Sequence, residues 1–285
     1  MTLFKHLRVR VWIFVTLPVF VGFFLNSLKG LDLNYFALVL SMFLFNGFIF
    51  TYNDLEDAPY DKEDTYKKIR NVFCGDDRRK KVIGKVIIFT TPLLSVLLGL
   101  YVSVGWALFA LGLVALGFLY SSPVFRAKER PVWDLVFHIV WISIMVVPGY
   151  LYFFRPDKLF FVIWGILATN SCIAQINNEL RDFSVDSLAG HRTTVIVLGK
   201  KRTFFLRWAL ELLLVSLILW MAVAYELHVL LLAVIPSFLY FVWVERIQAL
   251  DNTERIGDHR RMRIAYFLFL WMCVGIAEAA LKRFF

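Results

Sequence analysis

The sequence predicts an all-α integral membrane protein, a single domain over residues 1–285 with nine transmembrane helices. Of the 285 residues 60% are apolar and mean hydropathy is +0.68, whereas a soluble domain is about 45–50% apolar. The apolar residues also gather in runs of the length that crosses a bilayer. The three cysteines lie far apart in the sequence, without the paired spacing of a zinc site or a redox motif.

Each predicted span is a run of about 20 mostly apolar residues bounded by charge. The stretches 82–120 and 203–244 are each too long for one crossing, so we divide the first near residues 101–105 and the second near residues 225–226. The predicted spans are residues 11–29, 34–52, 82–101, 104–121, 133–153, 159–177, 203–222, 225–244 and 264–281.

The distribution of Lys and Arg predicts the orientation. With nine spans, the N-terminus and the loops after the even-numbered helices share one side, which holds 26 of the 31 basic residues. By the positive-inside rule, this side is cytoplasmic. The net charge of +9 is then explained by topology and by attraction to anionic membrane lipids, and nucleic-acid binding is not needed.

An acidic motif follows the second predicted span. The chain reads N-x-x-x-D-x-x-x-D from Asn53 through Asp57 to Asp61. If the helix continues, the spacing of four places all three side chains on one face, about 40° apart in succession. Pro59 makes a kink or an early helix end the expected distortion.

The same pattern returns after the sixth predicted span, from Asn178 through Asp182 to Asp186, followed by Gly190. Clustered carboxylates repel one another unless a cation lies between them. Oxygen ligands without His or Cys favour Mg²⁺, and protein-bound Mg²⁺ commonly fills its remaining positions with substrate phosphate. Basic residues near both motifs are candidate diphosphate ligands, together with Asn53: Lys67, Lys68, Arg70, Arg126, Lys128, Arg181 and Arg192.

With these motifs the whole chain resembles the UbiA superfamily of intramembrane prenyltransferases. Residues 53–61 match that family's N-D-x-x-D-x-x-x-D signature, and residues 182–190 match D-x-x-x-D-x-x-x-G. The resemblance implies nine helices around a central cavity and two Mg²⁺ ions that hold a prenyl diphosphate. It implies that the catalytic aspartates are Asp57, Asp61, Asp182 and Asp186, and that Asn53, Asp54 and Asn178 complete the metal site. Arg70 would steady the diphosphate.

Two features depart from the family pattern. The prolines and the serine that usually precede Gly75 are replaced in residues 71–74, and a Tyr-x-x-x-Lys pattern after the fourth span is absent because position 124 is Val. Arg126 and Lys128 are the nearest substitutes. The segments 120–128 and 190–194 look more like those of archaeal-type members.

The resemblance implies Mg²⁺-dependent transfer of a prenyl group to a lipophilic acceptor, such as a quinone precursor, an ether lipid or a carotenoid. Cationic groups and metal would stabilise the leaving diphosphate while an allylic carbocation forms. The alternative is a membrane transporter or a divalent-cation channel that uses the acidic motifs. A cation path would place acids at mid-depth, whereas these acids lie at helix ends among bases. The lack of a D-G-x-x-A-R signature speaks against a CDP-alcohol phosphotransferase.

Overall fold

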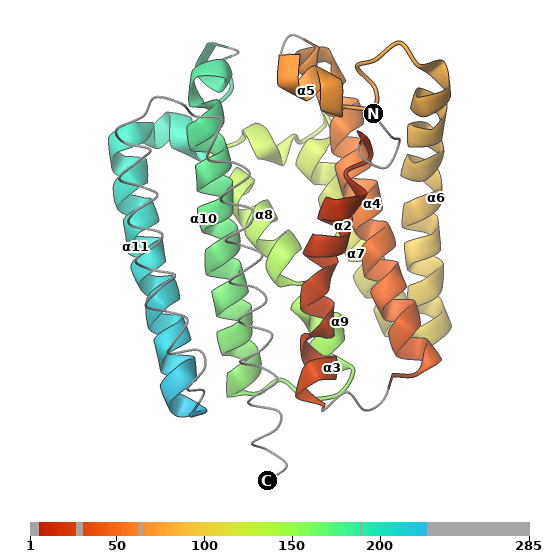
Figure 1. Cartoon of the computed structure of the whole chain (residues 1–285), viewed down its shortest axis with the longest axis vertical. Coiled ribbons are helices and arrows are strands. Elements are labelled where there is room, and N and C mark those ends of the chain that lie inside the picture. Colours follow the sequence, from red (N-terminus) through yellow and green to blue (C-terminus); the bar gives the residue numbers. More distant parts are fainter. Residues whose placement is uncertain (1–5, 27–30, 63–64, 189, 227–285) are drawn as a thin grey trace.

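The computed structural model describes residues 6–26, 31–62, 65–188 and 190–226, and the side chains of residues 65–67 and 185 are outside that description. Every regular element in this part of the chain is a helix. The long helices run side by side along one axis (Figure 1). The expected all-α membrane fold is therefore confirmed over the described residues.

Six helical segments are long and apolar enough to cross a membrane by length and composition. Five are single long helices or the apolar part of one, and α8 (Trp133–Ser143) and α9 (Val146–Leu151) together form the sixth. The helices are α4 (Leu33–Asp61), α6 (Arg78–Val102), α7 (Val104–Ser121), α8 with α9, α10 (Lys158–Leu188) and α11 (Thr194–Ala224). The predicted spans 225–244 and 264–281 lie essentially outside the described residues, so the expected count of nine is not tested.

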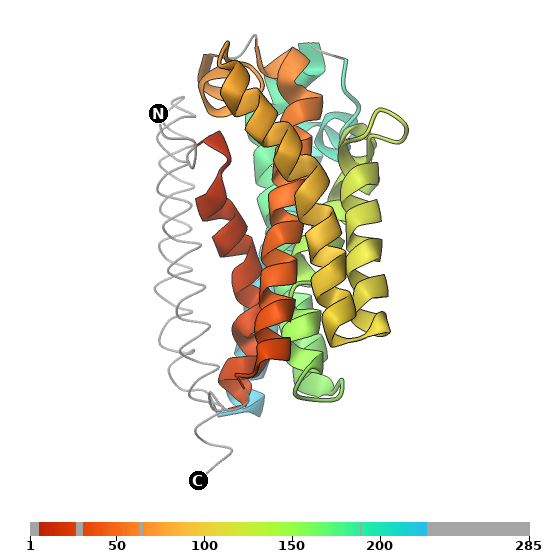
Figure 2. The same cartoon turned by 90° about the vertical axis from the view of Figure 1, so that its right-hand side faces the viewer.

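The first predicted span is broken into three short helices. They are α2 (Val9–Thr16), the 3-10 helix η1 (Leu17–Phe20) and α3 (Val21–Leu25). Pro18 lies at the start of the 3-10 turn, where its missing N–H is tolerated. The segment follows α4 along the bundle and contacts α4 and α9 (Figure 2).

Helix α4 determines where the first acidic motif lies. It begins after Asp32, whose carboxylate accepts a hydrogen bond from the backbone N–H of Tyr35 at 2.8 Å, the usual N-cap arrangement. The helix continues past Pro59 and ends at Asp61. The helix is therefore continuous through the whole acidic motif, and Asn53, Asp57 and Asp61 share one face of it, as the sequence analysis expected for an unbroken helix.

The described helices pack in pairs that bring α4 and α10 into one bundle. Helix α4 packs against α6 and α7, while α10 packs against α8 and α11, and α6, α7 and α4 lie side by side (Figure 2). Buried polar contacts join these helices: Ser41 donates to the carbonyl of Ser95 at 2.8 Å, and the indole of Trp141 donates to Asn46 at 3.0 Å. Hydrogen bonds of this kind fix the register between helices in an apolar environment.

The outward faces of several helices are apolar and exposed. Phe89 on α6, Leu108 on α7 and Phe205 on α11 are 76%, 63% and 69% exposed. An exposed apolar surface of this extent is expected where lipid replaces water as the solvent. These faces support the conclusion that the chain is an integral membrane protein.

The backbones of the first segment and α9 approach each other closely at two glycines. A β-carbon added to Gly149 would overlap the carbonyl oxygen of Val19, and one added to Gly22 would overlap the carbonyl oxygen of Gly149. We expect Gly149→Ala to lower the free energy of unfolding by about 3 kcal/mol, because main-chain atoms cannot move aside as a side chain does. Thermal unfolding in detergent micelles measures this.

Gly112→Ala is the matched control for this substitution. Gly112 also lies inside a helix, and a β-carbon there meets nothing within 4 Å. Alanine at that position should leave stability unchanged or raise it by about 0.5–1 kcal/mol, because alanine is the better helix former. Equal effects of the two substitutions would contradict the close packing.

Candidate active site

The first acidic motif forms a hydrogen-bonded group at the end of α4. The side-chain amide of Asn53 donates to Asp57 at 2.9 Å. Its carbonyl oxygen accepts from the hydroxyl of Ser121 at 2.9 Å and from the ammonium of Lys128 at 2.9 Å. Asn53 and Asp57 therefore lie on the same side of the helix, as their spacing of four residues predicts.

Two cations from the connection between α7 and α8 contact Asp57. Lys128 makes a short charged hydrogen bond to its carboxylate, and a guanidinium nitrogen of Arg126 lies 3.5 Å from the same oxygen. Burial lowers the pKa of Lys128, and the nearby Asp57 carboxylate opposes that shift. Both cations were predicted diphosphate ligands, and the structure places them beside the first motif.

This connection has an unusual backbone. Arg126 adopts φ 49° and Val132 adopts φ 72°, in a region that side chains other than Gly rarely occupy. Backbone strain of this kind costs about 1–3 kcal/mol per residue and persists where the surroundings hold it in place. Here the ion pairs of Arg126 with Asp57 and Glu129 hold the turn.

The second acidic motif is connected to the first through three residues, Arg126, Glu129 and His191. The Nε of Arg126 lies 2.5 Å from Glu129, and the Nε2 of His191 lies 3.5 Å from the same oxygen of Glu129. The Nδ1 of His191 lies 3.4 Å from Asp186. A continuous chain of polar contacts thus runs from Asp57 on α4 to Asp186 on α10.

Ring contacts join the end of α4 to the same two connections, the one between α7 and α8 and the one between α10 and α11. The ring of His191 meets the ring of Tyr60 edge to face, with centroids 5.6 Å apart. The guanidinium of Arg126 lies over the same Tyr60 ring at 5.1 Å. Both motifs therefore lie at the same end of the bundle, the upper end in Figure 1.

The other members of the second motif lie along the last turns of α10. Asp182 is partly buried and lies 3.2 Å from the Nε of its neighbour Arg181. Asn178, one turn earlier, is exposed. Arg192, just past the motif, is also exposed. These four predicted site residues lie at the same end of the bundle as the group around Asp57 (Figure 1).

Asp61 and Asp54 are held by residues of the first segment and of the α5–α6 connection. The amide of Asn71 donates to Asp61 at 2.9 Å and to the backbone carbonyl of Asp54 at 2.6 Å. The carboxylate of Asp54 is 1% exposed and lies 2.8 Å from Arg8. The structure therefore buries Asp54 between α2 and α4 beside Arg8, and its supporting role at a metal stays a prediction.

Three further predicted diphosphate ligands lie on α5 (Thr65–Arg70). Lys68 is exposed and Arg70 is partly buried at the helix end, while the side chain of Lys67 lies outside the described residues. Helix α5 covers the same end of the bundle as the two motifs (Figure 1). These cations are therefore placed near the acidic group by the fold, without a described contact to Asp57.

A buried polar cluster supports the second motif from below. The carboxylate of Asp134 accepts from the backbone N–H and the hydroxyl of Thr194, both at 2.5 Å. One oxygen of Glu179 accepts from Gln175 at 2.9 Å and the other from the N–H of Val195 at 3.2 Å. Because these residues belong to α8, α10 and α11, the cluster fixes the helix that carries Asp182 and Asp186.

We expect Asp134→Ala to lower the free energy of unfolding by about 3 kcal/mol, because it leaves buried donors without an acceptor. Thermal unfolding in detergent measures the change. Asp77→Ala is a suitable control, since Asp77 also accepts from a backbone N–H, that of Lys80 at 3.2 Å, but in an exposed position. A smaller loss for Asp134→Ala than for Asp77→Ala would contradict the role of the cluster.

The donors around the two motifs have the chemistry that Mg²⁺ prefers. Asn53, Asp57, Asp61, Asp182 and Asp186 all offer oxygen, the hard ligand type for Mg²⁺. Among the described residues, no three carboxylate, His or Cys side chains are close enough to form a ready cage. Instead, Lys128, Arg126 and His191 lie between the carboxylates. The donor set fits Mg²⁺, and Lys128 and Arg126 offset part of its negative charge.

Glu129 and His191 are residues of this site that the sequence analysis did not single out as ligands. Neither belongs to an acidic repeat, and each lies in a connection without helical periodicity. A weak signal was present, because Glu129 follows the two predicted cations and His191 follows Gly190 directly. Only the folded chain brings these two connections within contact distance.

Comparison with known families identifies the fold and the class. The model of the UbiA prenyltransferase family matches residues 15–274. The chain belongs to this family. It is thus an enzyme of the prenyltransferase class, as the paired motifs predicted, and the transporter alternative loses its basis. No curated protein sequence matches the chain significantly.

Solved structures of UbiA homologues share the fold over nearly the whole chain. A UbiA homologue from Archaeoglobus fulgidus bound to DMAPP and Mg²⁺ has a TM-score of 0.73 at 19% identity, covering 99% of each chain. The same protein bound to GPP and Mg²⁺ has a TM-score of 0.74 at 19% identity, covering 98% of this chain and 99% of that one. A digeranylgeranylglyceryl phosphate synthase structure has a TM-score of 0.65 at 15% identity, covering 98% of both chains.

Proposed function

We propose that this UbiA-family protein transfers a prenyl group from a prenyl diphosphate to a lipophilic acceptor, with Mg²⁺ as cofactor. One observation carries the proposal: the contacts of Arg126, Glu129 and His191 join the acidic motifs of α4 and α10 at one end of an apolar bundle. The archaeal homologue with the same fold was solved with prenyl diphosphates and Mg²⁺. A prenyl diphosphate has a charged head and a hydrocarbon chain. Its binding site therefore has to join a charged region to an apolar one, as the end of this helix bundle does.

Side chains of the site have separable roles in this proposal. Asp57, Asp61, Asp182 and Asp186 hold Mg²⁺, with Asn53 and Asn178 as further oxygen donors. Lys128 and Arg126, which contact Asp57 in the free protein, contact the diphosphate when substrate is bound. Mg²⁺ supplies positive charge that stabilises the diphosphate as a leaving group.

The remaining cations extend the diphosphate site. In the proposal, α5 contributes Lys67, Lys68 and Arg70 to diphosphate binding, and Arg181 on α10 and Arg192 after it contribute the rest. The C1–O bond then breaks, both bonding electrons leave with the diphosphate, and an allylic carbocation forms. An electron-rich acceptor forms a bond to C1 and loses a proton.

The apolar residues below the site suit the prenyl chain. Phe45, Ile49, Asn53 and Asp57 follow one another at intervals of four on α4, so the same helix face turns from apolar to charged along its length. Phe45 and Ile49 line a cavity of about 10 Å³ with aromatic residues of α7 and α8, namely Tyr120, Phe137 and Trp141. In the proposal these side chains move apart to admit the prenyl chain. Aromatic faces stabilise a passing carbocation by cation–π attraction, and the apolar walls exclude water.

Incubation with labelled substrates tests the reaction and its acceptor. Purified protein in lipid is given Mg²⁺, a labelled prenyl diphosphate, and in turn a hydroxybenzoate, a naphthoate, a glycerophosphate ether lipid and lycopene. We expect Mg²⁺-dependent diphosphate release coupled to a labelled lipophilic product with one of these acceptor classes. Absence of both diphosphate binding and release with every acceptor would overturn the proposal.

The proposed orientation places this end of the bundle in the cytoplasm. The excess of Lys and Arg on that side supports it. Single cysteines introduced at exposed positions near the site, such as Lys68, should react with a membrane-impermeant thiol reagent only after cells are opened, once the native cysteines are replaced. Labelling in intact cells would reverse the orientation.

A further inference from the structure

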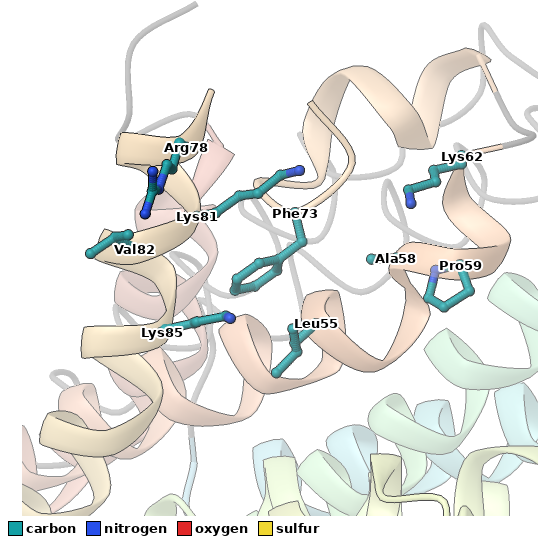
Figure 3. A pocket seen from close by; sticks show the side chains of 9 residues that line it. All are labelled: Leu55, Ala58, Pro59, Lys62, Phe73, Arg78, Lys81, Val82 and Lys85. Atoms are coloured by element: carbon teal, nitrogen blue, oxygen red, sulfur yellow. The ribbon is translucent and has the colours of Figure 1, made fainter. Parts of the chain in front are cut away.

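A basic pocket lies between α4 and α6, close to the active end of the bundle. Its volume is about 490 Å³. The floor is apolar, with Leu55, Ala58 and Pro59 from α4 and the ring of Phe73 from the connection to α6. Four cations surround it: Lys62, Arg78, Lys81 and Lys85. Figure 3 shows Lys81 and Lys85 reaching from α6 toward Phe73 and α4, with Lys62 on the opposite side.

This pocket is separate from the active site. Successive residues of an α-helix are rotated by about 100°, so Leu55, Pro59 and Lys62 lie roughly opposite Asn53 and Asp57 around α4. Lys128 and Arg126 approach α4 from the Asp57 side, whereas the pocket opens toward α6. A ligand in the pocket therefore does not contact the residues proposed to hold the diphosphate.

The four cations of the pocket give it a concentrated positive charge. Within the described part of the chain, none of them forms an ion pair with an Asp or Glu side chain. Arg78, Lys81 and Lys85 share one face of α6 at intervals of three and four, where like charges repel one another. An anion held between them would relieve that repulsion.

The position of Lys85 shows how the pocket relates to the membrane. It lies seven residues into α6, about 10 Å along the helix from Arg78, and is flanked by exposed Val82 and Val86. The exposed apolar face continues beyond it through Phe89 and Leu93. A cation at the upper edge of a lipid-facing stripe meets the phosphate layer of the bilayer.

We propose that this pocket binds the phosphate headgroup of an anionic phospholipid, with an acyl chain along the stripe of Val82, Val86, Phe89 and Leu93. The charges select an anion, and the apolar floor and stripe select one that carries a hydrocarbon chain. Basic pockets between transmembrane helices commonly bind anionic lipid headgroups. Because the lipid contacts both α4 and α6, it stabilises the helix that carries Asp57 and Asp61.

Native mass spectrometry of the full chain, purified with phosphatidylglycerol and phosphatidylcholine, tests the site. We expect the wild type to retain phosphatidylglycerol and Lys81→Gln/Lys85→Gln to retain it more than about tenfold less, since each cation near such a surface contributes a severalfold preference. The matched control Arg79→Gln/Lys201→Gln removes the same charge from exposed positions outside the pocket. It should retain the lipid as the wild type does, and equal loss in both double variants would overturn the proposal.

A photocrosslinker tests the location without depending on the lysine variants. Benzoylphenylalanine at Val86, in vesicles with equal amounts of the two lipids, should capture mainly phosphatidylglycerol. At Phe205, which is exposed on α11 near Lys201 and Arg202, it should capture the two lipids in nearly equal amounts. Equal enrichment at both positions would mean general attraction to a basic surface and would overturn a specific site.

Inorganic phosphate distinguishes a headgroup from a free anion. Phosphatidylglycerol should raise the thermal unfolding temperature of the wild type more than that of Lys81→Gln/Lys85→Gln. Inorganic phosphate should not produce this difference, because it lacks the hydrocarbon that occupies the α6 stripe. If inorganic phosphate protects the wild type selectively to the same extent, the assignment to a lipid is wrong.

Discussion

Asp57→Asn lowers the rate of prenyl transfer by at least about 10²-fold, the effect expected when one ligand of a catalytic metal or leaving-group site loses its charge. Asp57 is the carboxylate that Lys128, Arg126 and Asn53 all contact. The amide keeps the shape of the side chain but cannot neutralise Mg²⁺. Asp182→Asn should have the same effect from the second motif.

Radiolabelled product formation under saturating Mg²⁺ measures the loss. Asp76→Asn is the control, because Asp76 is an exposed acid in the connection before α6, and it should keep wild-type activity. Thermal unfolding of each variant separates loss of chemistry from loss of fold. Wild-type turnover in both Asp57→Asn and Asp182→Asn would remove the basis of the proposed site.

Lys128→Met raises the KM for the prenyl diphosphate by about 10–100-fold, corresponding to the loss of one or two charge-assisted hydrogen bonds. The ammonium of Lys128 is 11% exposed and already lies against Asp57 and Asn53. Lys128→Arg keeps the charge and should recover part of the affinity. Methionine replaces the aliphatic stem, so packing is largely preserved.

Steady-state kinetics with varied diphosphate concentration separate these outcomes. Lys201→Met, at an exposed position on α11, should leave KM unchanged. If Lys128 only supports the fold, Lys128→Met and Lys128→Arg would both be less stable and the KM of the remaining folded enzyme would not change. That result would contradict a role in diphosphate binding.

The acidic repeats were predictable because their information is local. A spacing of four within one helix specifies one face whatever the rest of the chain does, and α4 realises that spacing through Asp61. The apolar runs likewise predicted the long helices, because a bilayer requires about 20 apolar residues for each crossing. The predicted ends were less accurate where helices continue past the apolar region.

Helices α10 and α11 show why those ends were missed. The predicted span stops at residue 177, but α10 continues to Leu188 because Gln175 and Glu179 are satisfied within the helix and by Val195. Helix α11 begins at Thr194, before the predicted residue 203, and bends at Gly199, where φ is 72°. Hydropathy identifies what enters the membrane, while hydrogen bonding determines where a helix ends.

The sequence by itself determined the membrane class, the helical faces of the two motifs and the kind of ligand that they favour. Tertiary structure decided which groups meet. Lys128 contacts Asp57, which is 71 residues away in the sequence, and His191 contacts both Glu129 and Asp186. Asp54 forms an ion pair with Arg8. Helical periodicity is a property of neighbouring residues and can be read along the chain. Contacts between separate connections depend on how the helices pack, so only the folded chain specifies them.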